Sequence, residues 1–240
     1  METYAASHIG NIREENEDTV LIASGGGYIL AIVADGMGGH AGGKKASMMA
    51  AKHMQRKLRR EEEVMPRRLR ELVEETSREV FEAAEANENY KNMGSTLELA
   101  VVYSDMVIAA HVGDSRAYML RRGRLDRLTR DHSYVQYLVD NGYLSPEEAE
   151  VHPYKNIITR AIGMKEVEVD VYSTAFEEGY MLLLCSDGLT RHVKDSEIEV
   201  RLNGEGTIRD KVEDLIDLAL ERGGMDNITI ALISNEGEEK

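Results

Sequence analysis

The sequence has a single cysteine, Cys185, among 240 residues, and it has fewer basic than acidic side chains, 29 against 44. The lone cysteine excludes an internal disulfide and is compatible with a reducing compartment. Nucleic acids and anionic membrane surfaces are polyanions that bind Lys and Arg, so the net charge of −15 argues against both as partners. Clustered acidic side chains could instead attract divalent cations.

Long apolar runs are missing as well. No stretch approaches the ~20 apolar residues that a membrane-spanning helix needs, and the N-terminal segment METYAASHIG lacks the basic-then-apolar layout of a signal peptide. We therefore predict a cytoplasmic protein. Hydrophobic residues make up 42% of the chain, enough for a core, and no repeat or linker divides it. We expect one domain over residues 1–235 and a frayed acidic tail at 236–240.

Hydrophobic patterns predict strands in groups, with helices in groups between them. We expect strands at residues 19–23, 28–34, 97–103, 106–112, 116–122, 180–185 and 228–233. We expect helices at residues 44–60, 66–89, 134–141 and 207–222, and a helix start at Ser145. The three strands between 97 and 122 are expected to form an antiparallel meander. This grouping indicates an α+β fold rather than an alternating parallel α/β fold.

Several acidic residues share a local pattern, because each lies where an apolar strand meets a turn. They are Asp35 in ADGMGG, Asp114 in GDSR, Asp187 in SDG, Asp226 in MDN, and the pair Glu17 and Asp18 before the first expected strand. Taken singly, an Asp-Gly pair is more often only a turn. Several such carboxylates without a Cys or His ligand pattern favour Mg²⁺ or Mn²⁺ over structural zinc. The pattern therefore predicts a metal-assisted hydrolase.

Seven longer motifs make a resemblance specific. In order, they are GNIREENED (10–18), VADGMGGHAGG (33–43), MGSTL (93–97), VGDSRAY (112–118), LTRDHS (128–133), LLCSDGL (183–189) and GGMDNITI (223–230). Together they resemble the successive motifs of the PP2C, or PPM, family of metal-dependent protein serine/threonine phosphatases, in its bacterial single-domain form. The resemblance covers nearly the whole chain. It implies a four-layer αββα sandwich, in which two antiparallel β-sheets are flanked by helix pairs.

The resemblance also implies a metal centre with two Mn²⁺ or Mg²⁺ ions and, as in bacterial members, a third. By position in the motifs, Asp35 would bridge two metals and the carbonyl of Gly36 would ligate one of them. Asp187 and Asp226 would complete the other. Asp114 would hold, with Asp187, a third and weaker metal, although a plain hairpin turn at Asp114 is the competing interpretation.

Three further residues would take part in catalysis if the resemblance holds. Arg13 matches the family's phosphate-binding arginine, whose planar fork suits two contacts with phosphate oxygens. Glu17 and Asp18 would hold metal-bound waters from an outer position. A metal-bridging water would then attack the phosphorus directly. Because Cys185 lies outside any loop that could cradle phosphate, a cysteine-nucleophile phosphatase is disfavoured.

The motifs also depart from the family in places. Many eukaryotic relatives carry histidine where this chain has Met37, and His40, three residues on, has no assigned role. Lys44 stands where bacterial members often have glutamate. His132 in the DHS motif is interpreted as structural. Residues 133–163 correspond to the family's flap beside the active site.

Partner and activity predictions follow from these motifs. We expect phosphoserine and phosphothreonine proteins as substrates, among them a Ser/Thr kinase that the phosphatase opposes, and we expect a monomer. Two alternatives remain open. One is a catalytically inactive PP2C-like regulatory binding module, and the other is a calcium-stabilised interaction domain in which the same acids bind metal only structurally.

Overall fold

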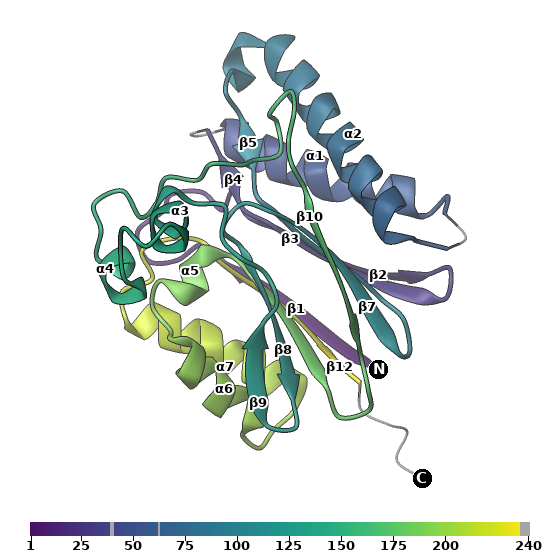
Figure 1. The fold of residues 1–240 in the computed structure, drawn as a ribbon, viewed down its shortest axis with the longest axis vertical. Coiled ribbons are helices and arrows are strands. Elements are labelled where there is room, and N and C mark those ends of the chain that lie inside the picture. The colour runs from purple at the N-terminus through teal and green to yellow at the C-terminus, as the bar shows by residue number, and fades with distance from the viewer. Residues whose placement is uncertain (39–40, 62, 236–240) are drawn as a thin grey trace.

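The computed structural model describes residues 1–38, 41–61 and 63–235. Two five-stranded antiparallel sheets make up the centre of the molecule (Figure 1). The first sheet contains, in order, β1 (Glu2–His8), β12 (Ile228–Ser234), β11 (Met181–Cys185), β8 (Arg116–Arg121) and β9 (Arg124–Arg127). The second contains β10 (Asp170–Ala175), β7 (Met106–Val112), β6 (Leu97–Val102), β3 (Tyr28–Ala34) and β2 (Thr19–Gly25). A small third sheet pairs β4 (Gly36–Met37) with β5 (Gly94–Ser95).

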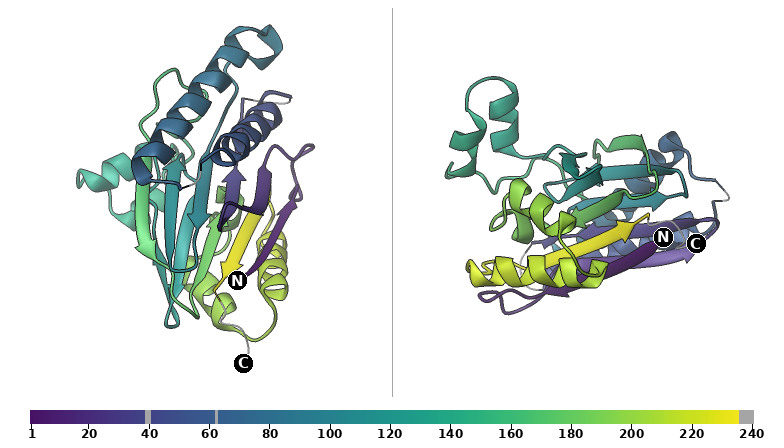
Figure 2. Two further views of the ribbon diagram at one scale, coloured as in Figure 1. Left: turned by 90° about the vertical axis from the view of Figure 1, so that its right-hand side faces the viewer. Right: turned by 90° about the horizontal axis from the view of Figure 1, so that it is seen from below.

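Helices cover the outer face of each sheet, so the expected α+β fold with four αββα layers is confirmed. The second sheet carries α1 (Ala41–Leu58) and α2 (Pro66–Glu85), and the first carries α6 (Asp195–Asn203) and α7 (Ile208–Glu221). Figure 2 shows these helix pairs on opposite sides of the sandwich, with the first and last strands side by side. In the part of the chain that the structure describes, no helix is long and apolar enough to cross a membrane.

The position of strand β3 between two cores explains why its sequence is a continuous apolar run. Side chains alternate between the two faces of a strand. Leu30 and Ile32 pack into the core beneath α1 and α2, whereas Ala31 and Val33 pack into the core between the two sheets. Both faces are buried, as the sequence predicted. A third core, which includes Leu183, lies beneath α6 and α7.

The expected meander is wrong in its third strand. Strands β6 and β7 pair in the second sheet, but β8 pairs with β11 and β9 in the first sheet. The chain crosses between the sheets at Gly113, which has a left-handed backbone with φ of +111°. Alternation of side chains shows that a segment is a buried strand but not which sheet it joins.

Other boundaries differ in smaller ways. The expected helix at 66–89 ends at Glu85, and a single turn of 3₁₀ helix, Glu88–Tyr90, follows after Asn87 takes an extended backbone. The sequence patterns missed β1, β9, β10 and α6, all short or rich in polar residues. The expected tail at 236–240 lies outside the described residues.

Between β9 and β10 the chain leaves the sandwich and forms α3 (Tyr134–Asp140) and α4 (Pro146–Glu150), which stand apart from both sheets (Figure 2). The predicted helix start at Ser145 is confirmed. Its hydroxyl accepts a hydrogen bond from the N–H of Glu148, whose side chain accepts one from the N–H of Ser145. Several large side chains of this segment are exposed, among them Tyr137, Tyr143 and Tyr154.

Candidate metal centre

The predicted aspartates gather at one edge of the sandwich. Asp35 follows β3, Asp114 lies in the crossing between β7 and β8, and Asp187 begins the short helix α5 (Asp187–Thr190) after β11. Asp226 comes shortly before β12. Since adjacent antiparallel strands place the end of one beside the start of the next, this single edge collects residues from both sheets. We call these four residues, together with Asp18, the acid cluster.

Electrostatics shows how close these carboxyl groups are. Burial raises the pKa of Asp35 well above its usual range, and the charges of Asp18, Asp187, Asp114 and Asp226 raise it further. Burial is also the main reason why the pKa of Asp18 and that of Asp114 each rise to about 7. The acid cluster therefore lacks enough nearby positive charge to keep the pKa values of these carboxyl groups in their ordinary range.

Two arginines supply the positive charge that the cluster contacts. Arg191 donates one hydrogen bond to Asp187 and another, of 2.9 Å from Nη1, to Oδ2 of Asp226. Arg13 Nη2 lies 2.9 Å from Oδ2 of Asp226, and its Nε lies 2.9 Å from Oδ1. Arg13 was predicted at this site, but Arg191 was not. Arg191 follows Asp187 by four residues, a spacing that brings two side chains together on one face of a helix. This spacing was the signal that could have identified Arg191.

Asn227 holds the loop that carries Arg13 and Glu17. Its side-chain carbonyl accepts a hydrogen bond of 2.8 Å from the N–H of Glu17. Its amide group donates to the carbonyl oxygens of Ile9 and Glu15 at 2.9 and 3.0 Å. The sequence analysis placed Asn227 in a motif without a role, and the structure gives it this one.

Thr96 connects two parts of the acid cluster. Its hydroxyl accepts a hydrogen bond of 2.9 Å from the N–H of Asp35, and its own N–H donates to the carbonyl of Asp35 at 2.8 Å. The same hydroxyl lies 2.7 Å from that of Ser115, the neighbour of Asp114. Both hydroxyls are buried, so this buried contact joins Asp35 to the turn that carries Asp114.

Close backbone packing explains the glycines at this edge. A Cβ atom on Gly36 would lie 2.3 Å from the carbonyl oxygen of Gly43 and 2.6 Å from that of Glu17. A Cβ on Gly188 would lie 1.9 Å from the carbonyl oxygen of Asn227. Any larger residue would force these loops apart, so the glycines allow the loops that carry the acids to approach.

The side chains present fit a hard divalent cation. Oδ1 of Asp18 and Oδ1 of Asp187 are buried, and neither has a hydrogen-bond partner among the described residues. Buried carboxylate oxygens without a partner are costly unless a cation compensates them, and carboxylates are the ligands that Mg²⁺ and Mn²⁺ prefer. Within residues 1–38, 41–61 and 63–235, no three His, Cys, Asp or Glu side chains already converge as ligands. Asp187 and Asp226 contact arginines instead.

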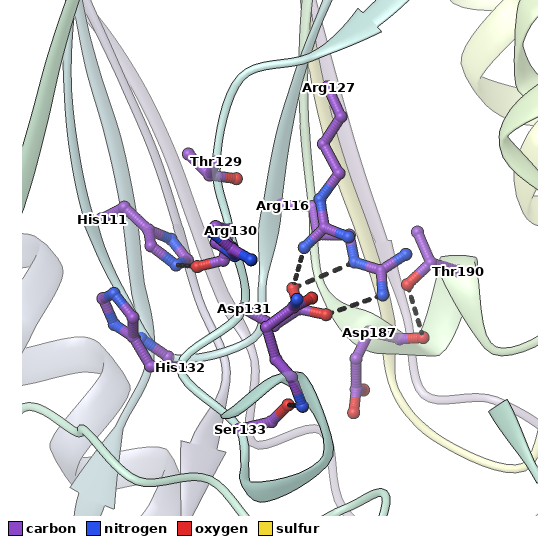
Figure 3. A network of polar contacts seen from close by, with 12 residues as sticks. His111, Arg116, Arg127, Thr129, Arg130, Asp131, His132, Ser133, Asp187 and Thr190 are labelled. Atoms are coloured by element: carbon purple, nitrogen blue, oxygen red, sulfur yellow. Dashed lines mark hydrogen bonds and ion pairs between the residues drawn. The ribbon is translucent and has the colours of Figure 1, made fainter. Parts of the chain in front are cut away.

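A second polar network adjoins the acid cluster (Figure 3). Asp131 accepts hydrogen bonds from Arg116, at 3.1 and 2.8 Å, and from Arg127. Burial alone would raise the pKa of Asp131, but the two guanidinium groups lower it below its ordinary value. Burial raises the pKa of Asp187, and the charge of Arg116 is among those that oppose this rise, so the two networks lie within electrostatic reach of each other.

His132 forms hydrogen bonds with the turn that carries Asp114. Its N–H donates to the carbonyl of Gly113 at 2.7 Å, and its Nδ1 accepts from the N–H of Gly113 at 3.2 Å. The backbone carbonyl of His132 accepts a hydrogen bond of 2.7 Å from Thr159, at the base of the excursion that contains α3 and α4. These contacts agree with the structural role that the sequence analysis gave His132.

All eight predicted site residues therefore lie at the same edge of the sandwich. They are Arg13, Glu17, Asp18, Asp35, Gly36, Asp114, Asp187 and Asp226. His40 falls outside the described residues. Lys44 is exposed at the start of α1. Cys185 is buried, and burial raises the pKa of its thiol.

The chain is similar to known phosphatases over nearly its whole length. A family model described as protein phosphatase 2C matches residues 6–226. The chain is 38% identical to the serine/threonine phosphatase stp of Listeria monocytogenes, over 96% of this chain and 94% of that protein. It superposes on the serine/threonine phosphatase of S. agalactiae with a TM-score of 0.91, at 40% identity and over 97% of this chain and 98% of that one. It also superposes on the catalytic domain of the phosphatase PstP in complex with two manganese ions, with a TM-score of 0.85, at 34% identity and over 96% of each chain.

Proposed function

The chain belongs to the protein phosphatase 2C family, and on that basis we propose that it hydrolyses phosphoserine and phosphothreonine in proteins at a divalent-metal centre. The observation that carries the proposal is the acid cluster, whose carboxylates have too few positively charged neighbours in the protein to balance them. A solved relative with two manganese ions supports a metal at this edge. We further propose that the protein is a cytoplasmic monomer and that it opposes a Ser/Thr kinase.

In this proposal Asp35, the carbonyl of Gly36, Asp187 and Asp226 would hold two metal ions. Asp114 together with Asp187 would hold a third. When bound, Mn²⁺ or Mg²⁺ would supply positive charge that neutralises phosphate oxygens and lowers the pKa of water. The uncompensated oxygens described above support this assignment.

Arg13 would bind the substrate phosphate. Its side chain is 49% exposed while its guanidinium contacts Asp226, so a phosphate arriving from solvent can reach the group that touches the metal site. The planar fork of arginine matches two phosphate oxygens and would hold the phosphorus in line for attack. The hydrogen bonds of Asn227 keep the Arg13 loop in place.

Glu17 and Asp18 would orient water at the centre rather than ligate metal directly. Asp18 is fixed from one side, because Ser186 Oγ donates to its Oδ2 at 2.8 Å. Its other oxygen, Oδ1, is buried and has no hydrogen-bond partner among the described residues. Outer groups of this kind orient the ligands of a metal and the water beside it.

We propose residues 133–163 as a flap that controls access for protein substrates. The base of this segment is joined to the Asp114 turn through His132 and Thr159. Its exposed tyrosines provide apolar surface that a protein substrate could contact. Neither Met37 nor any described histidine is assigned the role of general acid.

The test is hydrolysis of p-nitrophenyl phosphate and of a phosphothreonine peptide with Mn²⁺, Mg²⁺, Ca²⁺ or EDTA. We expect turnover with Mn²⁺ or Mg²⁺, none in EDTA, and a loss of more than ~100-fold in Asp187→Ala, since a ligand should matter more than an outer-shell partner. Asp217→Ala, which removes an exposed carboxylate of α7, is the control and should retain activity.

No turnover with any metal, by protein shown to be folded, would overturn the enzyme and favour the inactive binding module. Binding of Ca²⁺ with a gain in thermal stability, but without turnover, would favour the calcium-stabilised interaction domain.

A further inference from the structure

Arg191 bridges two carboxylates that come from different elements. Asp187 begins α5, and Asp226 precedes β12. The Arg191 side chain is only 27% exposed, and one guanidinium nitrogen contacts each carboxylate. Arginine can do this because its nitrogens form a rigid fork. In this arrangement a single cation joins two of the proposed metal ligands.

Other acids act on Arg191 as well. Burial would lower the pKa of its guanidinium, but Asp187, Asp226, Asp114 and Asp35 together raise it. The guanidinium therefore lies in the negative field of most of the acid cluster. It carries the kind of charge that a metal would bring to the same place, and charges so close together compete.

We propose that Arg191 is an internal counter-ion that holds Asp187 and Asp226 together in the metal-free protein and must be displaced when metal binds. This inference rests on the proposed metal centre and adds a residue that controls how tightly the centre binds metal. A metal that binds Asp187 and Asp226 must break their contacts with Arg191, so its measured affinity is lower than the carboxylates alone would give.

Asp187 offers a route for this exchange. Its Oδ2 contacts Arg191, whereas its Oδ1 is buried and has no hydrogen-bond partner in the described part of the chain. A cation can contact Oδ1 before the guanidinium leaves Oδ2. Arg13 does not bridge the two acids in this way, because within the described residues its guanidinium pairs with Asp226 and not with Asp187, and its side chain is more exposed.

The test is direct measurement of Mn²⁺ binding by calorimetry with Arg191→Gln, which removes the charge. We expect the dissociation constant to fall by about tenfold, equivalent to ~1.4 kcal/mol. Arg209→Gln is the matched control, because Arg209 also pairs with a carboxylate four residues away, Glu213, but on the exposed face of α7. Its dissociation constant should equal that of the native protein.

Thermal unfolding gives a second readout that needs no activity. In EDTA the melting temperature of Arg191→Gln should be lower than that of the native protein, because the acid cluster loses its counter-ion. Saturating Mn²⁺ should close this gap, since the metal replaces the guanidinium in both proteins. A variant that folds only with Mn²⁺ would support the proposal in the same way.

Arg191→Lys covers the case in which the glutamine variant does not fold under either condition. Lysine keeps the charge but cannot bridge two carboxylates with a planar fork, so Mn²⁺ should bind it more tightly than it binds the native protein. Unchanged or weaker binding in the variants would overturn the inference while leaving the metal centre intact. A native protein that binds no Mn²⁺ would overturn the metal centre and the inference with it.

Discussion

The acid cluster gathers several carboxyl groups, whereas in the adjoining network a single carboxylate, Asp131, lies between two arginines, so charge is balanced differently in the two regions. Asp131 lies between Arg116 and Arg127, and its pKa is below the ordinary value. Asp35 lies among other carboxylates, and its pKa is raised. Burial is common to both, so burial alone does not distinguish a functional carboxylate from a structural one. The balance of charge does.

The physical reason is the cost of taking a charge out of water. A buried carboxylate whose partners compensate it can hold structure together, because removing a partner leaves an unpaired charge. A buried carboxylate without compensation raises the energy of the folded protein unless a ligand supplies the missing charge. The comparison therefore predicts opposite effects of substitution in the two networks.

The largest effect on stability should come from Asp131→Ala. This change leaves Arg116 and Arg127, which are 23% and 25% exposed, without their shared partner. Breaks of fully buried pairs cost ~3–5 kcal/mol in the free energy of unfolding, so that range is the upper limit here. Urea denaturation in EDTA measures this loss of unfolding free energy. Asp126→Ala, at a more exposed carboxylate of β9, should change stability by less than ~1 kcal/mol. Equal losses in the two variants would remove the distinction between the networks.

A smaller effect should appear in the pH dependence of stability. Burial lowers the pKa of His132 to about 4, and the charges of His111 and Arg160 lower it as well, although Asp170 opposes them. The unfolded chain, with an ordinary histidine pKa of ~6.5, binds more protons than the folded protein between those two values. Stability should therefore fall as pH decreases from about 6.5 to about 4, by at most ~1.4 kcal/mol per pH unit for this group.

Urea denaturation of the native protein and of His132→Gln across that range measures this contribution. The variant should show a shallower decrease in unfolding free energy with falling pH. If the native and variant curves ran parallel, His132 would not be held neutral by its surroundings, and the network around the Asp114 turn would be less rigid than described.

The smallest effect should come from Asp35→Asn, and its sign should be the reverse of that for Asp131. Removing one charge from the acid cluster should raise the unfolding free energy in EDTA, on the order of 1 kcal/mol, because like charges no longer repel. The same variant should lose most of the stabilisation that Mn²⁺ confers on the native protein. A loss of stability in EDTA would mean that Asp35 is compensated after all.

Local chemistry made much of this fold predictable. The apolar run at 28–34 predicted β3 with the same bounds, and the cap at Ser145 predicted the start of α4. Short or polar strands such as β1 and β9 lack a long apolar run, so no pattern marked them. The resemblance of the motifs to a family, rather than periodicity, identified the acids as one candidate site.

By itself, the sequence determined which segments are buried and which acids stand at strand ends, because these depend on side-chain alternation and on turn residues close in the chain. Only the tertiary structure decided that β8 joins the first sheet, where Tyr118 lies opposite Leu183. It also decided that Arg116 compensates Asp131 while Arg191 joins Asp187 to Asp226. The pairs Arg116–Asp131 and Arg191–Asp226 join residues far apart in the chain, so no local pattern encodes them, unlike the contact of Arg191 with Asp187 four residues away.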